Sequence, residues 1–310
     1  MQPKEIDICA LPEPIYQRMR LASPALERMF ALGALDCLSQ PQLAIVGSRR
    51  ASPQGLRDAL WFGQCLAESG MSVVSGLAIG VDSEAHRGAI RGGGTTIAVL
   101  GHGLNHLYPS RNRMLLEEIL HSGGLVLSEY SAETPARPHQ FLQRNRIIAA
   151  ISGAVCVIEA AIDSGSLTTA LACAEFGGDV FAVPGSIHEP RYEGSHRLIR
   201  EGACLVRSPN ELLSDLGYRP NQKTLEGFEA TASHSDQSHA SNKRSFSKTP
   251  VGSDARAEQI LRAMDTNPIA LSTLETALSL SAGEVLAGLL QLEVFGRVHR
   301  LSDGRWQQLH

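Results

Sequence analysis

The chain has 310 residues, of which 43% are hydrophobic, so it can bury one large core and a second, smaller one. Its net charge of −4 excludes a molecule that attracts polyanions over its whole surface, and any nucleic-acid site must be local. The six cysteines are widely spaced and form no C-x-x-C pair, which argues against a disulfide framework and a zinc site.

The beginning of the chain, "MQPKEIDICALPEP", lacks a basic segment followed by an apolar one and is not typical of a signal peptide. The longest apolar run, residues 147–162, is interrupted by Ser152, Gly153 and Glu159 and is too short and too polar to span a bilayer. We therefore expect a cytoplasmic protein that makes no contact with a membrane.

From Gln42 onward, short apolar segments alternate with helical ones. Seven β-branched runs are typical of strands buried on both faces: residues 42–47, 71–76, 95–101, 125–130, 154–160, 179–185 and 203–207. Ser52 and Pro53 predict the start of the first helix and Gly70 its end, while Gly123 ends a helix that begins near Ser110. This alternation predicts a doubly wound, mostly parallel α/β sheet, in which ligands bind beyond the carboxyl ends of the strands.

The stretch "AIVGSRR" ends the first of these strands in Gly47, Ser48 and Arg49. It matches neither G-x-G-x-x-G nor G-x-x-x-x-G-K-[ST], so dinucleotide-binding and P-loop assignments lose their main support. A phosphate still fits such a turn, because glycine allows close backbone approach, serine donates its hydroxyl and arginine forks onto the anion. The alternative is an ordinary strand-to-helix turn with an exposed arginine.

The stretch "SGLAIGVDSEAH" repeats this arrangement after the second strand, and Ser75 and Gly76 are candidates for a second phosphate contact. Asp82 or Ser83 is expected to cap the following helix. Asp82 and His86 stand one helical turn apart, but two ligands do not make a metal site, so we expect a surface pair instead.

The stretch "RPHQFLQRNRIIAAIS" mixes cationic and stacking side chains before an aliphatic run. Its candidate DNA-binding residues are Arg137, His139, Phe141, Arg144, Asn145 and Arg146. Arginine with an aromatic ring is the combination that holds single-stranded nucleic acid, and residues 41–218 contain arginines throughout but not one lysine. A GC-rich genome is an equally good account of that bias. The alternative for the motif itself is a core Phe141 with arginines paired to Glu129 or Glu133.

The stretch "EAAIDSGSLTTA" places Ser164, Gly165, Ser166 and Thr168 at the start of a helix that follows a buried strand. Backbone N–H groups, hydroxyls and the helix dipole converge there on an anion. An ordinary helix cap needs one hydroxyl, and three hydroxyls with a glycine favour a phosphate site.

The C-terminal third changes character. Residues 219–254 are rich in serine and other polar residues without an apolar period, which predicts a flexible linker. Residues 255–310 predict three helices and a hairpin, the elements of a winged-helix-like module. The third of these helices, "AGEVLAGLLQLE", has two glutamates and no basic residue, so it suits a DNA major groove poorly.

Taken in order, "AIVGSR", "SGLAIGVD", "GTTIAVLGHGLNHLYPSRN", "GGLVLSEY", "FLQRNRIIAAISGAVCVIEAAIDSGSLTTA", "VFAVPGSI" and "GSHRLIREGA" closely resemble the DNA-processing protein A (DprA, or Smf) family over nearly all of residues 41–210. The resemblance implies an extended Rossmann-like domain over residues 41–218. It also implies single-stranded DNA binding, a homodimer, and loading of a RecA-type recombinase during natural transformation, without cofactor or metal.

By position, the resemblance assigns residues 47–49 to a phosphate site, Phe141 and residues 144–146 to a Phe-x-x-Arg-Asn-Arg element, and residues 164–166 to a helix-start pocket. The chain departs from the family in having Leu142 where a proline is usual. Family members often carry a helical domain in front, and residues 1–40 are expected to hold a reduced form of it or none.

Two other functions compete with this interpretation. One is a Rossmann-like phosphoribohydrolase with Glu159 as acid or base, although "VPGSIHEP" lacks most of the motif P-G-G-x-G-T-x-x-E. The other is a winged-helix transcription factor, which the third C-terminal helix disfavours. The preferred hypothesis is a DNA-binding recombination mediator with no catalytic residues.

Overall fold

A computed structural model describes residues 2–218 and, in the C-terminal part, residues 255–264, 269–278, 280–281, 285–286, 288–289, 292, 298–301 and 305–308. The chain divides into two compact units, Met1–Ser235 and Asp236–His310. The boundary falls within residues 219–254, and the linker expected there lies outside the described residues.

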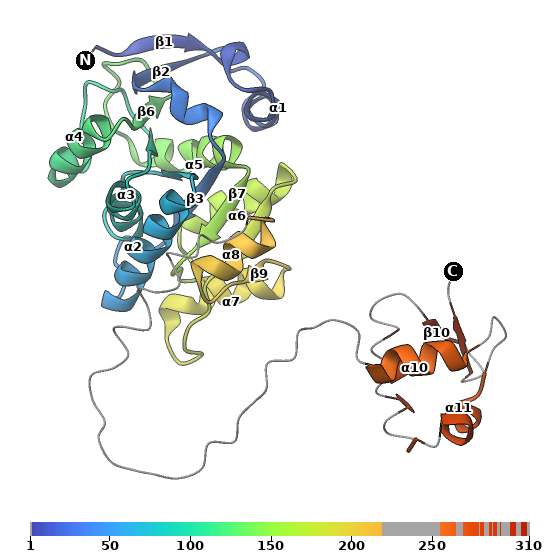
Figure 1. The fold of residues 1–310 in the computed structure, drawn as a ribbon. Coiled ribbons are helices and arrows are strands. Elements are labelled where there is room, and N and C mark those ends of the chain that lie inside the picture. Colours follow the sequence, from blue (N-terminus) through green and yellow to red (C-terminus); the bar gives the residue numbers. More distant parts are fainter. Residues whose placement is uncertain are drawn as a thin grey trace. The chain divides into compact units, whose positions relative to one another are not determined.

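A nine-stranded sheet forms the centre of the first unit (Figure 1). Its seven predicted strands are confirmed as β3 (Gln42–Val46), β4 (Ser72–Ser75), β5 (Thr96–Leu100), β6 (Leu125–Ser128), β7 (Ala154–Val157), β8 (Asp179–Ala182) and β9 (Cys204–Leu205). The order is β1-β2-β6-β5-β4-β3-β7-β8-β9, and all pairs from β6 to β9 are parallel. The chain builds outward from β3 to β6 and then crosses to β7 on the other side of β3. The topological switch point therefore lies between β3 and β7.

Helices cover both faces of this sheet because its strands are apolar on both sides. Alternate residues of β3 belong to different cores, with Ala44 and Val46 in one and Leu43 and Ile45 in the other. The first face is covered by α1 (Glu13–Ala22), α5 (Pro138–Ser152), α6 (Ser166–Glu175) and α7 (Glu193–Arg200). The second face is covered by α2 (Pro53–Glu68), α3 (Val81–Arg91), α4 (Arg113–His121) and α8 (Pro209–Asp215).

The predicted helix boundaries hold for α2 and α4. Ser52 caps α2, since its Oγ accepts from the N–H of Gly55 at 3.0 Å, and Pro53 is the first helical residue. Gly70 follows the end of α2 with φ +81°, and Gly123 follows α4 with φ +79°. The expected cap of α3 is wrong, because Gly80 occupies the cap position and Asp82 and Ser83 lie inside the helix.

Two strands from residues 2–40 belong to the sheet. Strands β1 (Lys4–Asp7) and β2 (Arg28–Gly33) pair antiparallel with each other, and β2 pairs antiparallel with β6. Helix α1 packs on α5, where the Arg18 guanidinium donates to the carbonyls of Ala150 and Ile151 at 2.7 and 3.2 Å. These residues therefore extend the main domain, and the expectation that the domain starts at residue 41 needs correction.

The second unit has a small core of its own, described without reference to the first. Helices α10 (Ala255–Ala263) and α11 (Leu271–Leu278) and the antiparallel strands β10 (Val298–Arg300) and β11 (Trp306–Gln308) match predicted elements. Trp306 is buried among the apolar side chains of this unit. The third predicted helix lies partly outside the described residues.

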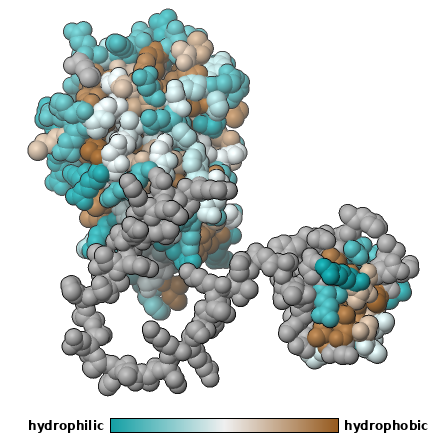
Figure 2. Space-filling model, viewed as in Figure 1, coloured by the Kyte–Doolittle hydropathy of each residue, from teal (hydrophilic) through white to brown (hydrophobic). Residues whose placement is uncertain are grey.

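Hydrophilic residues cover most of the face of the first unit seen in Figure 2, and apolar ones form only small scattered patches there. Within the part of the chain that the structure describes, no helix is long and apolar enough to cross a membrane.

Candidate nucleic-acid interface

A cavity of about 580 Å³ opens at the switch point of the sheet. It is lined by Val46, Gly47, Ser48, Arg49, Arg50, Ala78, Asp82, Tyr108, Pro138, Phe141, Leu142, Arg144, Asn145, Ile148, Ala161, Asp163, Ser164, Gly165, Ser166 and Thr169. These residues come from the carboxyl end of β3, from the segments that follow β3, β4, β5 and β7, including the starts of α3 and α6, and from α5. The prediction of polar motifs meeting beyond the carboxyl ends of the strands is confirmed.

The loop after β3 forms one wall of the cavity. A side chain at position 47 would have its Cβ 2.8 Å from Cγ2 of Val81, so only glycine fits there. The N–H of Ser48 donates to the carbonyl of Glu159 at 2.7 Å, and its Oγ accepts from the N–H of Arg50 at 3.1 Å. These bonds hold the loop in place while the side chain of Arg49 stays exposed.

The start of α6 forms the opposite wall. The hydroxyls of Ser164 and Ser166 are 2.7 Å apart, and both residues line the cavity with Gly165 at the helix cap. The predicted cluster of hydroxyls at a helix N-terminus is therefore present. Thr168 is exposed but does not line the cavity, and its Oγ1 accepts from Nδ2 of Asn145 at 2.8 Å.

An aromatic group stands at the mouth of the cavity. The ring centroids of Phe141 and Tyr108 are 5.5 Å apart, and His102 approaches Phe141 edge-on at 6.3 Å. Cζ of Arg49 lies 5.6 Å from the Phe141 centroid, within the range of a cation–π contact. Phe141 is half-buried, so it is neither a full core residue nor freely exposed.

Arg144 is buried, with 4% of its surface exposed. Its guanidinium donates to the carbonyl of Gly76 at 2.7 Å and to that of Val99, and it packs against Gly76 so closely that no Cβ fits there. Burial lowers the pKa of Arg144 to about 10, opposed by the charge of Asp82, so the side chain stays cationic at neutral pH. Arg144 therefore fastens α5 to the ends of β4 and β5.

Asp82 is the buried partner of this cation. Its Oδ2 accepts from the N–H of Gly76 at 3.1 Å and from that of Ala78 at 3.4 Å. Burial raises the pKa of Asp82, and the charge of Arg144 lowers it. The expected surface pair of Asp82 and His86 is wrong: both are buried, and Nδ1 of His86 contacts Oγ1 of Thr96 at 2.7 Å.

Arg146 faces away from the cavity. Its guanidinium forms an ion pair of 2.7 Å with Glu129, as the structural alternative for this motif anticipated. Helix α5 begins at Pro138, so Arg144 lies in its second turn and Arg146 in its third. Their side chains diverge, and only Arg144 reaches the cavity wall.

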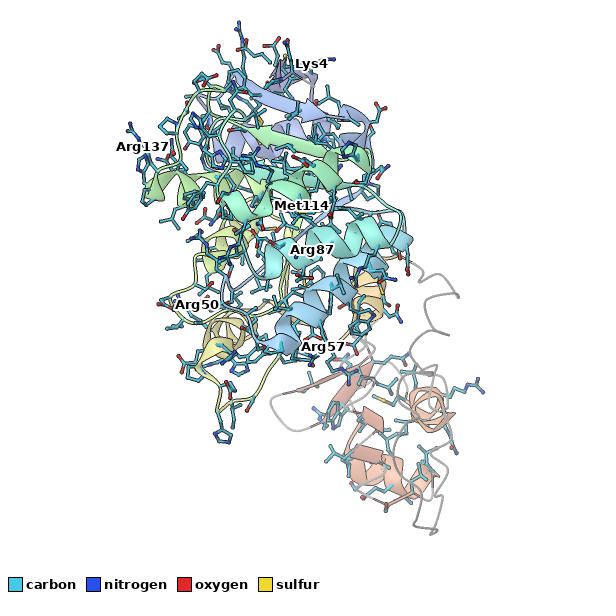
Figure 3. The ribbon with its side chains drawn as sticks, turned by 90° about the vertical axis from the view of Figure 1, so that its left-hand side faces the viewer. Lys4, Arg50, Arg57, Arg87, Met114 and Arg137 are labelled. Atoms are coloured by element: carbon cyan, nitrogen blue, oxygen red, sulfur yellow. The ribbon has the colours of Figure 1, made fainter. Side chains whose placement is uncertain are left out.

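Four further predicted residues also lie off the cavity lining, namely Ser75, Gly76, Arg137 and His139. Ser75 is fully buried, and its hydroxyl donates to the carbonyl of Ile45 at 2.6 Å. Arg137 and His139 are exposed near the start of α5. Figure 3 shows Arg137 and Arg50 along the same edge of the first unit. Arg137 therefore extends the cationic surface from the lining residue Arg50 beyond the cavity itself.

Eleven of the twenty lining residues were not predicted, among them Arg50, Asp82, Tyr108, Leu142 and Asp163. Arg50 adjoins a predicted residue. Tyr108 belongs to the "HLYPSRN" loop after β5, and the rule that parallel strands share one carboxyl edge was the signal that could have found it.

The cavity has a local excess of positive charge. Asp82 balances Arg144 inside the wall, which leaves Arg49 and Arg50 against the single carboxylate of Asp163. Within residues 2–218, neither Arg49 nor Arg50 forms an ion pair. Among all described residues, no group of three or more His, Cys, Asp or Glu side chains is placed to hold a metal ion.

Glu159, the candidate acid or base of a hydrolase, is fully buried outside the cavity lining. Its carboxylate accepts from the N–H of Ser52 at 3.0 Å and from the Ser52 hydroxyl at 2.6 Å. This carboxylate fixes the start of α2 and does not face the cavity.

Two family models match the chain. DNA recombination-mediator protein A covers residues 13–217, and the DprA winged helix domain covers residues 245–304. The chain is 37% identical to Protein Smf of Synechocystis sp., over 96% of this chain and 78% of that protein. It is 45% identical to the DNA processing protein DprA of Streptococcus pneumoniae, over 61% of this chain and 67% of that protein.

Solved structures give the same relation. The X-ray structure of DprA from Streptococcus pneumoniae matches with a TM-score of 0.63 and 39% identity, over 69% of this chain and 74% of that one. The structure of DprA from Helicobacter pylori, described for its single-stranded DNA binding mode, matches with a TM-score of 0.63 and 26% identity, over 71% and 98%.

Proposed function

The chain belongs to the DNA recombination-mediator protein A family, and we propose that it binds single-stranded DNA in the switch-point cavity. One observation carries the proposal. An exposed arginine, a row of hydroxyls at a helix start and a half-buried aromatic ring line a single cavity. The Helicobacter pylori protein named for its single-stranded DNA binding mode shares this fold.

The chemistry of the cavity suits a single strand better than a duplex. Ser48, Arg49 and the α6 start offer donors to phosphate oxygens, and the ring pair of Phe141 and Tyr108 offers an aromatic surface to unpaired bases. Stacking on an aromatic ring does not depend on base identity, so we expect binding without sequence preference. Arg137 and Arg50 would then guide the strand along the edge seen in Figure 3.

Within the proposed function, Arg144 takes a different role from Arg49. The guanidinium of Arg144 is bonded to two carbonyls and to Oδ1 of Asn145, so Arg144 positions the cavity wall. Arg146 is held by Glu129 and supports the helix that carries Phe141. We assign the proposed phosphate contacts to Gly47, Ser48, Arg49 and residues 164–166.

We further propose that the bound strand is protected and passed to a RecA-type recombinase during natural transformation. The description of the matching family as recombination mediators supports this step. A homodimer and a cytoplasmic location complete the proposal, both resting on family membership. No chemical step is proposed, because the one carboxylate considered as acid or base, Glu159, is bonded to Ser52.

The test compares two arginine substitutions in the full chain. Arg49→Ala should weaken binding of an oligo(dT) by about 1.5–3 kcal/mol, because a charge-assisted contact to phosphate is lost. Arg91→Ala, at the far end of α3, is the matched control and should have little effect. The affinity for oligo(dT) should fall steeply as the salt concentration rises. For Arg49→Ala the slope of log affinity against log salt concentration should be smaller by roughly one unit, the value expected for one lost phosphate contact.

A fragment of residues 1–218 separates this function from its rivals. It should keep the affinity of the full chain within a few-fold, ignore duplex DNA of any sequence and leave nucleoside monophosphates intact. Residues 1–40 must be retained because β1 and β2 belong to the sheet. Failure of the full chain to bind oligo(dT) at low salt, or equal losses for the two arginine variants, would overturn the proposed site.

A further inference from the structure

Tyr108 is an unusually exposed aromatic residue in the lining of the cavity. It has 55% of its surface exposed, although its ring contacts Phe141 at a centroid separation of 5.5 Å with the planes tilted by 44°. Within residues 2–218 its hydroxyl forms no hydrogen bond. The contact with Phe141 therefore fixes one side of the ring and leaves much of the rest open to the cavity.

The ring of Phe141, in contrast, already has neighbours around it. The Arg49 guanidinium lies over it at 5.6 Å, and His102 and Tyr108 approach it from the loop that follows β5. A base that stacked directly on Phe141 would have to displace at least one of them. The open surface of Tyr108 requires no such displacement.

The rim of the cavity continues from Tyr108 as an apolar edge. Leu142 follows Phe141 and is 56% exposed, and its Cδ2 lies 3.7 Å from where a Cβ would stand at Gly165. The donors of Ser48, Ser164 and Ser166 belong to the same cavity. A DNA single strand presents the flat faces of its bases and the anionic oxygens of its phosphates. A cavity with both an apolar edge and a group of hydrogen-bond donors matches these two features.

We propose that Tyr108 is the principal base-stacking platform of this site, with Phe141 packed against it as support. The inference rests on the proposed binding of single-stranded DNA and adds to it the residue that contacts a base. Phe141 then acts by orienting Tyr108 and Arg49, both of which contact its ring. Tyr108 reads the presence of a base and not its identity.

The experiment uses the full chain and two probes of equal length, an oligo(dT) and an abasic deoxyribose-phosphate strand. Tyr108→Ala should bind oligo(dT) roughly 5- to 150-fold more weakly, which corresponds to about 1–3 kcal/mol at 1.4 kcal/mol per tenfold change. Its affinity for the abasic strand and its salt dependence should equal those of the unmodified chain. Met114→Ala, which removes a 73% exposed side chain of α4 outside the cavity, should bind both probes normally.

A second variant guards against a folding defect. Tyr108→Trp should keep the affinity for oligo(dT), and its added emission, measured against the background of Trp61 and Trp306, should be quenched by oligo(dT) but not by the abasic strand. Absence of that quenching overturns the role of Tyr108, and so does normal binding of oligo(dT) by Tyr108→Ala. An equal loss for both probes overturns it too.

The two proposals fail differently. If the unmodified chain binds oligo(dT) and Tyr108→Ala binds it equally well, only the stacking role of Tyr108 is lost. If the unmodified chain binds neither probe at low salt, single-strand binding itself is wrong, and the inference falls with it.

Discussion

Replacing Arg144 by alanine separates a positioning role from a phosphate contact. The substitution removes two hydrogen bonds from a cation to carbonyls and leaves the buried Asp82 without its partner charge. Breaking a buried charge pair by removing one partner costs about 3–5 kcal/mol of folding free energy. For a unit of this size that corresponds to a fall in Tm of about 6–20 °C. The salt dependence of DNA binding should not change, because Arg144 is not available to phosphate.

The defect should depend on pH through Asp82. Burial raises the pKa of Asp82 above its ordinary value, so the folded state binds this proton more readily than the unfolded chain does. The contribution of Asp82 to stability is therefore fully present below that ordinary value and is lost as pH rises through the raised pKa. In the unmodified chain the Arg144 charge opposes this loss. Without Arg144 the pKa of Asp82 rises further, so the destabilisation should be larger at neutral pH than in mildly acidic solution.

The Tm of Arg144→Ala, measured by differential scanning calorimetry at neutral and at mildly acidic pH, tests this account. The double variant Arg144→Ala/Asp82→Asn serves as the compensating variant. The second substitution removes the uncompensated charge and keeps an oxygen for the N–H groups of Gly76 and Ala78. It should recover part of the lost Tm at neutral pH. The reasoning is refuted if Arg144→Ala has the Tm of the unmodified chain and a weaker salt dependence of binding.

Two further predictions concern the same helix. Phe141→Ala should weaken binding of all single strands to a similar extent, because it removes the support of Tyr108 and Arg49; the salt dependence should not change, because no charge is lost. Since Phe141 is half-buried, the loss of folding free energy should be smaller than the about 3–5 kcal/mol of a core phenylalanine, and the fall in Tm correspondingly small. A loss of the full size would identify Phe141 as a core residue. Arg146→Ala should lower the folding free energy by about 1–3 kcal/mol, because the ion pair with Glu129 is lost, and should leave the salt dependence of DNA binding unchanged. A salt dependence weaker by about one unit would show instead that Arg146 contacts a phosphate.

The sequence was sufficient for the parallel part of the sheet but not for its antiparallel edge. Strands β3 to β9 follow from apolar runs whose burial on both faces is independent of their neighbours in the chain. Strand β1, "KEID", is mostly exposed and has no apolar pattern, and β2 acquires its place only by pairing with β6. Such edge strands depend on a tertiary contact, which residue pattern alone does not reveal.

The candidate site was predictable in its position and not in the direction of its side chains. Motifs at the carboxyl ends of β3, β4 and β7 met as parallel topology requires. The sequence pattern did not predict which way the Arg144 and Arg146 side chains point, because residues 147–151 of α5 are all buried. The second half of α5 is buried and apolar on every side, so it has no exposed face from which the directions of the polar residues before it can be inferred.

Residues 144–146, the Arg-Asn-Arg sequence, hold this helix in place through polar contacts. Each of the three residues reaches a different partner: Arg144 the ends of β4 and β5, Asn145 the start of α6, and Arg146 the carboxylate of Glu129. Together they fix α5 against the loops around the cavity, and Phe141 stands one turn earlier on that fixed helix. A single strand is flexible and loses conformational freedom when it binds, so a site ordered in advance avoids a second ordering cost on the protein side. The guanidinium groups of Arg144 and Arg146 are therefore two anchors of the helix, and Arg49, on the loop after β3, is the cation proposed to contact the DNA.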